Sequence, residues 1–150
     1  MRKAILIAII SLILVGCRQD VVYSHFESIP TTGWDADSAK VFYPTLEDSL
    51  GDYEILIHIR HTDRYAYQNL WMFVDLNADS VLLRRDTIEV QMANARGEWV
   101  SKGITQHTLP IIYLDQVSLD SGSYTVHIQQ GMREEKLRGI SEVGLKVVKR

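Results

Sequence analysis

The stretch Tyr53-Glu54-Ile55-Leu56-Ile57-His58-Ile59-Arg60 decides the fold. Its odd-numbered positions are tyrosine or isoleucine, whereas its even-numbered positions are glutamate, leucine, histidine and arginine. Because successive side chains of a β-strand point to opposite faces of a sheet, this alternation predicts a strand with one buried face. No stretch of residues 17–150 shows convincing helical periodicity over ten residues. We therefore predict an all-β domain.

Other short apolar or alternating runs lie on both sides of this stretch, separated by turn residues. With residues 53–60 they make about eight strands, with a turn about every ten residues, which is typical of a single antiparallel β-sandwich of jelly-roll type. We predict the remaining strands at residues 21–26, 40–43, 70–76, 81–92, 109–114, 124–128 and 142–148.

Two segments allow more specific expectations. Residues 70–76 (LWMFVDL) are apolar at almost every position, so we expect a central strand covered on both faces. Residues 132–139 are charged and short, so we expect one turn of helix there and not a core helix. We expect the inward-facing residues to form the core: Tyr53, Ile55, Ile57, Ile59, Leu70, Met72, Val74, Tyr124, Val126, Ile128, Val143, Leu145 and Val147.

The N-terminus has the layout of a secretory signal peptide. Arg2 and Lys3 precede an apolar run over residues 4–15. This run would extend about 18 Å as a helix, well short of the roughly 30 Å hydrocarbon core of a bilayer. The ending Leu14-Val15-Gly16-Cys17 resembles the bacterial lipobox, in which a diacylglyceryl group is attached to the cysteine thiol and the chain is cleaved before it.

These features predict three parts of the chain. Residues 1–16 are a cleaved lipoprotein signal peptide, residues 17–21 a lipidated tether, and residues 22–150 the β-sandwich domain. Multiple acyl chains on Cys17 would be sufficient for stable attachment to a membrane. Removal of Arg2 and Lys3 changes the formal charge from −3 to −5, and this acidic balance argues against nucleic acid as a partner.

No pattern of residues points to catalysis, a metal or a cofactor. Cys17 is the single cysteine, which excludes an internal disulfide, and the five histidines lack ligand spacing and are interpreted as half-exposed strand positions. The segment 75–79 (DLNAD) matches the start of a calcium loop, but Ser80 stands where the sharp turn needs glycine. We interpret this segment as a polar turn between strands.

Aromatic residues gather in the stretch RYAYQNLW, residues 64–71, with Trp99 further along the chain. Aromatic rings beside polar amides can form a protein contact or a platform for a sugar. We assign Trp71 to the core and expect Tyr65 and Tyr67 at the rim of the sandwich. The possible partner-contact residues are Tyr65, Tyr67, Asn69, Trp99 and Arg133.

Three segments, residues 53–70, 86–103 and 131–148, resemble the GldH-type gliding-motility lipoproteins of the Bacteroidetes. The resemblance rests on Arg60, Tyr65-x-Tyr67-x-Asn69-Leu70, Asp86-Thr87, Gly97-x-Trp99, Met132-Arg133 and Val143-Gly144, and with the lipobox it covers essentially the whole chain.

The resemblance implies an outer-membrane lipoprotein without enzymatic activity. Such a protein would be a component or stability factor of the gliding-motility and type IX secretion machinery, with envelope proteins as partners. Only one acid, Asp20, follows closely after Cys17, and we expect the periplasmic face. The alternative is a carbohydrate-binding β-sandwich lipoprotein, which the aromatic residues near Gln68 and Asn69 motivate.

Lipidation is directly testable. Cys17→Ser should leave an uncleaved or mislocalised precursor, because no other thiol can accept the diacylglyceryl group. Intact-mass analysis of the wild-type protein should find an acylated Cys17 at the mature N-terminus. A different first residue, or an unmodified thiol, would contradict the prediction.

Overall fold

The structure is a computed structural model that describes residues 20–49 and 51–150. Cys17 and the predicted signal peptide lie outside the described residues. Within the described part of the chain all regular structure is β-strand, and no helix there could span a membrane. The strands are β1 (Asp20–Ser28), β2 (Trp34–Asp35), β3 (Lys40–Phe42), β4 (Thr45–Leu46), β5 (Gly51–Thr62), β6 (Asn69–Ala78), β7 (Val81–Gln91), β8 (Lys102–Gly103), β9 (Gln106–Leu119), β10 (Gly122–Gln130), β11 (Lys136–Leu137) and β12 (Ile140–Lys149).

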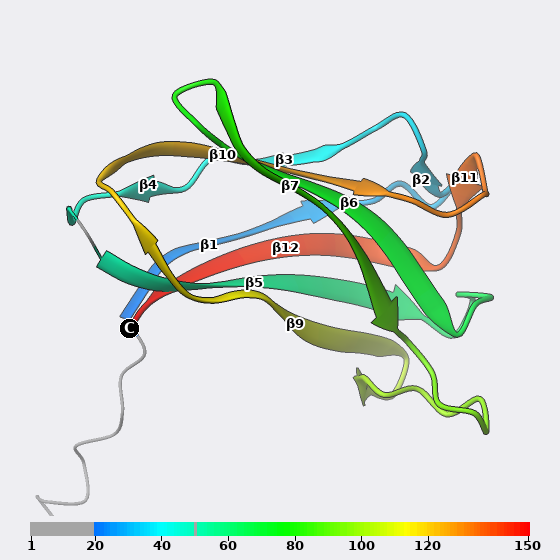
Figure 1. The fold of residues 1–150 in the computed structure, drawn as a ribbon. Coiled ribbons are helices and arrows are strands. Elements are labelled where there is room, and N and C mark those ends of the chain that lie inside the picture. Colours follow the sequence, from blue (N-terminus) through cyan, green and yellow to red (C-terminus); the bar gives the residue numbers. More distant parts are fainter. Residues whose placement is uncertain (1–19, 50) are drawn as a thin grey trace, which may run out of the picture.

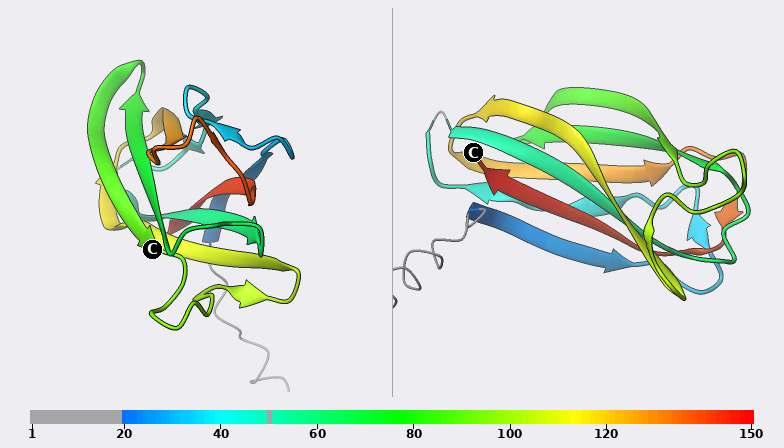
Figure 2. Two further views of the ribbon diagram at one scale, coloured as in Figure 1. Left: turned by 90° about the vertical axis from the view of Figure 1, so that its right-hand side faces the viewer. Right: turned by 90° about the horizontal axis from the view of Figure 1, so that it is seen from below.

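Two antiparallel sheets face each other (Figures 1 and 2). We call them sheet A, with the order β1-β12-β5-β9-β8, and sheet C, with the order β3-β10-β6-β7 and β4 also paired to β10. Short strands β2 and β11 form a separate pair. Eight strands of the described chain have more than two residues: β1, β3, β5, β6, β7, β9, β10 and β12. When these eight are renumbered 1 to 8 in chain order, sheet A has the order 1-8-3-6 and sheet C has the order 2-7-4-5. This is the order of a jelly roll, so the predicted fold class is confirmed.

The core lies between the two sheets and consists of the residues that the alternation predicts. Ile55, Ile57 and Ile59 on β5 are at most 2% exposed, and their cross-strand neighbours on β12 are equally buried. Leu70, Met72 and Val74 from β6 meet them from sheet C with no exposed surface. Every residue of the predicted core is buried, because in a two-layer sandwich the period-two pattern alone determines which side chains face inward.

Two expectations were wrong. β6 is covered on its inner face only: Trp71 is 37% and Phe73 45% exposed on the outer face of sheet C. Among the described residues, nothing forms a third layer over either sheet, so an apolar run need not be buried on both sides. Residues 132–139 form no helical turn but contain β11, whose Leu137 pairs with Trp34 of β2 and is 1% exposed.

Truncation of Ile57 should measure the strength of this core. Ile57→Ala removes a fully buried side chain and should lower the free energy of unfolding by about 2–5 kcal/mol, as measured by urea denaturation. Ile112→Ala is the matched control, since Ile112 lies on neighbouring β9 with 60% exposure and should change stability by at most about 0.5 kcal/mol. Equal effects of the two substitutions would show that the register is incorrect.

Candidate partner-contact site

The five predicted contact residues all lie at one end of the sandwich, which we call the loop end. Tyr65 and Tyr67 lie between β5 and β6, Asn69 begins β6, Trp99 lies between β7 and β8, and Arg133 lies between β10 and β11. Because β1 has nine residues, this end lies roughly 30 Å from Asp20, where the described chain begins. The jelly-roll connections bring together loops that are far apart in the sequence (Figure 1).

A pocket of ≈ 510 Å³ opens at this end, between the start of β6 and the segment that follows β10. The pocket contains three of the predicted residues, Tyr67, Asn69 and Arg133, and it leaves out Tyr65 and Trp99. Its remaining lining comes from Trp71, Gly131 and Met132. The pocket thus combines two aromatic side chains, a thioether, an amide and a guanidinium, a combination that suits a mixed apolar and polar protein contact.

Buried Gln130 holds one wall of the pocket. Its side chain is 2% exposed, its Oε1 accepts from the backbone N–H of Met132 at 2.8 Å, and its Nε2 donates to the carbonyl of Glu134 at 2.7 Å. The backbone N–H of Gly131 also donates to the carbonyl of Trp71 at 2.7 Å. These bonds fix the turn after β10 against β6, so that Met132 and Trp71 stay side by side.

Polar side chains hold the opposite wall. The Tyr67 hydroxyl donates to Oε1 of Glu134 at 2.5 Å, and this hydrogen bond to a carboxylate raises the pKa of Tyr67. Asn69 Nδ2 donates to Oε1 of Glu89 on β7 at 2.6 Å. Both side chains are therefore already oriented in the free protein, which reduces the entropy that a partner must remove on binding.

The predicted burial of Tyr65 and of Trp71 was wrong: Tyr65, expected at the rim, is buried, and Trp71, expected in the core, is exposed. Tyr65 is 3% exposed, donates its hydroxyl to the carbonyl of Asn69 at 2.7 Å, and supports Tyr67 edge to face with ring centroids 5.8 Å apart. Burial raises its pKa. Gly139 permits this packing, because a Cβ at that position would lie 2.3 Å from the backbone nitrogen of Tyr65. Trp71, expected in the core, is the exposed aromatic residue of the pocket.

A histidine pair lies beneath Trp99. The rings of His61 on β5 and His107 on β9 stack with centroids 5.0 Å apart, and the two residues are 0% and 6% exposed. The expectation of half-exposed histidines is wrong for both, because their strands turn these positions toward the core. Asp63 accepts from Trp99 Nε1 and pairs with His107 Nε2, each at 2.9 Å.

Ser101 completes this cluster, with its Oγ 2.7 Å from His61 Nε2. A serine beside a histidine is the beginning of a nucleophilic triad, in which a carboxylate orients the histidine. Here Nδ1 of His61 faces the backbone carbonyl of Thr62 at 3.4 Å, and the nearby Asp63 contacts His107 and Trp99 instead. The contacts of the cluster fasten the 99–101 segment to β5 and β9.

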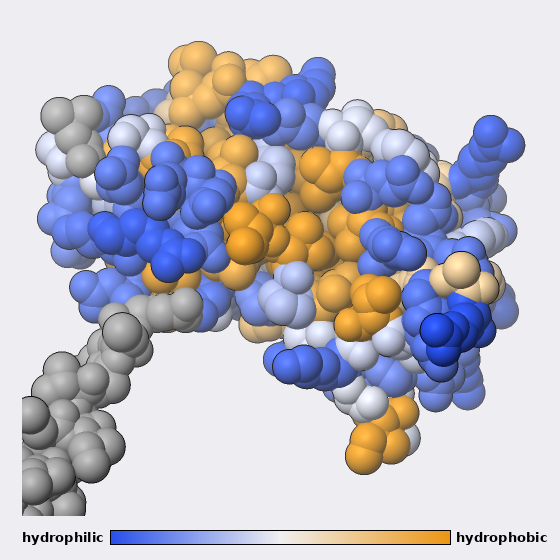
Figure 3. Space-filling model, turned by 60° about the horizontal axis from the view of Figure 1, so that its bottom comes forward, coloured by the Kyte–Doolittle hydropathy of each residue, from blue (hydrophilic) through white to orange (hydrophobic). Residues whose placement is uncertain are grey.

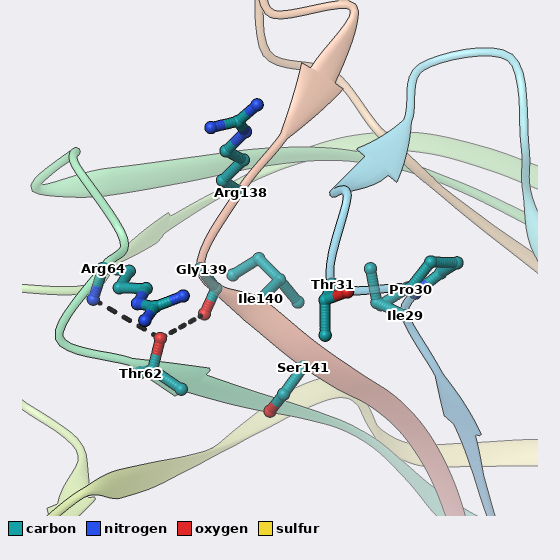
Figure 4. A pocket seen from close by; sticks show the side chains of 9 residues that line it. All are labelled: Ile29, Pro30, Thr31, Thr62, Arg64, Arg138, Gly139, Ile140 and Ser141. Carbon is teal, nitrogen blue, oxygen red and sulfur yellow. Dashed lines mark hydrogen bonds between the residues drawn. The ribbon is translucent and has the colours of Figure 1, made fainter.

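Two arginines beside the loop end carry unpaired charge. Arg64 and Arg138 both line a second pocket of ≈ 610 Å³ between the β1–β2 turn and the start of β12, where Arg64 extends toward the pocket and Arg138 points away from the other lining residues (Figure 4). Thr62 Oγ1 bonds the backbone of Arg64 and of Gly139, both at 3.4 Å, and so joins the two segments. Within the described residues, neither guanidinium has a carboxylate partner.

The segment that resembles a calcium loop is a tight hairpin. Asp75 lies within β6, and Nε and Nη2 of Arg85 on β7 donate to its carboxylate at 2.8 and 2.7 Å. Asp79 and Ser80 both have positive φ, as a two-residue hairpin turn requires. No group of three or more potential ligands among the described residues is arranged to hold a metal ion.

Residues 21–147 match the sequence model of the GldH lipoprotein family. The chain belongs to this family. The gliding motility lipoprotein GldH of Flavobacterium johnsoniae is 29% identical, over 91% of this chain and 90% of that protein. A GldH homolog from Christiangramia forsetii is 33% identical, over 99% and 98% of the two chains. The family that the sequence resembles is thereby confirmed, and gliding motility is the role that the names of these relatives support.

Solved structures similar to this GldH-family chain have low sequence identity. An Eiger TNF from S. frugiperda matches with a TM-score of 0.41 and 12% identity, over 89% of this chain and 94% of that one. A CBM35 from Cellvibrio japonicus Abf62 matches with a TM-score of 0.40 and 15% identity, over 86% and 87%. At such identities the similarity concerns the fold alone.

The sequence contains a pattern that could have predicted the exposure of Trp71, but it contains none that predicts the stacking of His61 on His107. Trp71 alternates with Leu70 and Met72, so one of these two faces had to point outward in a two-layer sandwich. His61 and His107 meet only because β5 and β9 pair in one particular register, and they are 46 positions apart in the sequence.

The buried histidine should make the fold sensitive to acid. Burial lowers the pKa of His61, and burial also lowers that of His58, with Lys146 and Arg60 adding to the effect there. Between these lowered values and about 6.5 the unfolded chain binds more protons than the folded protein, so the free energy of unfolding rises with pH in this window and falls as pH decreases below about 6.5.

Urea unfolding measured between about pH 5 and pH 7.5 tests this dependence. The double substitution His58→Gln with His61→Gln should flatten the profile, because the two groups that lose protons on folding are then missing. A profile as steep as that of the wild type would assign the pH dependence to other groups.

Proposed function

We propose that this protein is a lipid-anchored, non-catalytic component of the gliding-motility and type IX secretion machinery, attached to the outer membrane on its periplasmic face. It stabilises its complex by contact: the acyl chains on Cys17 hold the domain at the membrane, and the loop end binds an envelope protein. Membership of the GldH family, whose relatives are named gliding motility lipoproteins, supports the role in motility.

The observation that carries the contact role is the preorganised pocket around Trp71. Trp71 is 37% exposed beside half-buried Tyr67 and Met132, and Gln130 fixes the wall that holds Met132 in place. Large aromatic and thioether side chains in a rigid pocket are typical of the residues that dominate binding at protein interfaces. Arg64 and Arg138 also line a neighbouring pocket together with Glu134 and Glu135. This part of the loop end can therefore pair with both acidic and basic side chains of a partner.

The arrangement of Tyr65, Tyr67 and Trp99 favours a protein over a sugar. Tyr65 and Tyr67 meet with an interplanar angle of 70°, and Tyr65 and Trp99 meet at 48°. A sugar ring stacks best on flat, exposed aromatic faces, and these rings instead cover one another's faces and edges. The polar groups beside them, Tyr67 and Asn69, are already bonded to Glu134 and Glu89.

A tethered domain needs only a weak interface. Attachment of two partners to one membrane can raise the effective concentration of one for the other into the millimolar range, roughly as a short linker does. A pocket of moderate size can therefore be sufficient to keep a complex assembled while the acyl chains remain inserted.

Substitution of the pocket residues tests the proposal in a deletion strain. Trp71→Ala with Met132→Ala should weaken capture of the partner, measured by pull-down from solubilised outer membrane with mass spectrometry. Loss of a central aromatic contact costs at least about 2 kcal/mol of binding free energy, roughly thirtyfold in affinity. Gliding or type IX secretion should decline in parallel, while the level of the folded domain stays constant.

Tyr43→Ala is the matched control, because Tyr43 is an exposed aromatic residue, 67% accessible, that lies outside the pocket. It should leave partner capture unchanged. The proposal fails if pocket and control variants behave alike, if an unlipidated soluble domain restores full function, or if the purified protein turns over a substrate.

A further inference from the structure

We propose that the protein lies on the bilayer with the outer face of sheet A and the β8–β9 turn against the lipid. The surface that the proposal assigns to lipid comprises Ile104, Val100 and Lys102 at one end of the face, Ile112 in its middle, and Val21 and Val22 beside the anchor. The proposal rests on the proposed lipidation of Cys17 and adds an orientation to it.

The length of chain between the anchor and the fold limits where the domain can be. Three peptide units join Cys17 to Asp20, which can span at most about 11 Å. Asp20 is the first residue of β1, and β1 is an edge strand of sheet A. The Asp20 end of that strand must therefore stay within about 11 Å of the lipid headgroups. Contact through the end that contains Asp20 and contact through the outer face of sheet A both satisfy this limit.

The composition of the end that contains Asp20 argues against an end-on contact. Exposed carboxylates of Glu47, Asp48, Asp52 and Asp120 lie in or beside the turns that precede β5 and follow β9. Among these, Asp48 pairs with Lys149. Pressing carboxylates against the acyl region removes their hydration, and anionic headgroups repel them, so this end is better solvated by water.

The outer face of sheet A carries exposed apolar side chains, and the carboxylates of Glu54 and Glu142 on it are paired with Arg150 and Arg60. Ile112 is 60% exposed and lies opposite half-buried Leu56 across the β5–β9 pair, while Pro110 lies opposite His58 in the next outward row. Apolar side chains extend across the middle of the face that Figure 3 turns forward. Residues 20–49 and 51–150 place no further layer over this face (Figure 2).

The β8–β9 turn supplies the most exposed large apolar side chain of the described residues. Ile104 is 90% accessible, and Val100 nearby is 46% accessible. Gly103, with φ +150°, holds the turn in this shape, because a Cβ there would lie 1.9 Å from the carbonyl oxygen of Gln106. Lys102 precedes it with an exposed side chain that can reach headgroup phosphates, as lysines at membrane interfaces do.

The β8–β9 turn and Asp20 both belong to sheet A. The segment between β7 and β9 projects beyond sheet A, away from sheet C (Figures 1 and 2). Contact at both ends of the face holds the domain flat on the bilayer. Sheet C then faces away from the membrane, and the pocket with Trp71 on β6 is presented to a partner.

Nitroxide labels in the mature, acylated protein test the orientation. Acylation converts the Cys17 thiol to a thioether, so a cysteine introduced elsewhere is the single site for labelling. Labels at Ile104→Cys and Ile112→Cys should lose collisions with a water-soluble nickel chelate when the protein is bound to vesicles of phosphatidylethanolamine and phosphatidylglycerol. Val81→Cys is the matched control, because Val81 is 63% exposed on sheet C and its label should stay accessible.

Each outcome decides between the alternatives. Labels at 104 and 112 that remain as accessible as the label at 81, or a label at 81 that becomes shielded instead, would overturn the orientation while leaving the anchor intact. Intact mass and retention on the vesicles report the anchor separately: a mature protein without acyl groups would remove the proposed lipoprotein function and the orientation with it. Ile104→Glu should also restore access of the chelate to the label at 112.

Discussion

The burial of alternating aliphatic side chains between two sheets is the interaction on which the rest of the structure depends. Ile57 and Leu145 from sheet A and Met72 and Val126 from sheet C have no exposed surface. Each such side chain contributes about 1.5–3 kcal/mol when it leaves water, which offsets the entropy lost as the chain becomes ordered. With one cysteine in the sequence, no internal disulfide can help, so the precise facing of the two sheets must supply the stability.

Once the sheets face each other, the jelly-roll connections determine where function can reside. The β5–β6, β7–β8 and β10–β12 connections converge at one end and pack on buried Tyr65 and the His61–His107 pair. Their polar groups bond one another, as Gln130 does to the turn that holds Met132. The loops are therefore a rigid continuation of the core, and the pocket at Trp71 is preorganised.

Charged side chains on the edge strand β7 discourage other chains from pairing with that edge of sheet C. β7 is an edge strand of sheet C, and Arg84 and Asp86 on it occupy the same face as inward-pointing Ile88 and Val90. Arg84 bonds Asp86, and the Tyr113 hydroxyl of β9 donates to the same carboxylate at 2.6 Å. Inward-pointing charges on an edge strand discourage pairing with another chain. Contact with other proteins is thereby directed away from this edge, which is consistent with a contact role for the pocket on sheet C.

The sequence by itself determined the all-β class, the core and the family, because alternation is local and each inward position can be counted along its own strand, as from Tyr53 to Ile59. The alternation along a strand does not reveal whether the outer face of its sheet is covered. For this reason we expected Trp71 in the core, although its side chain is exposed. Tertiary structure alone brought Arg133 beside Asn69, stacked His61 on His107, and buried Tyr65. These residues are far apart in the sequence, and their sequence separation does not indicate how close they lie in space. They meet because the register of the two sheets brings the connecting loops to the same end of the sandwich.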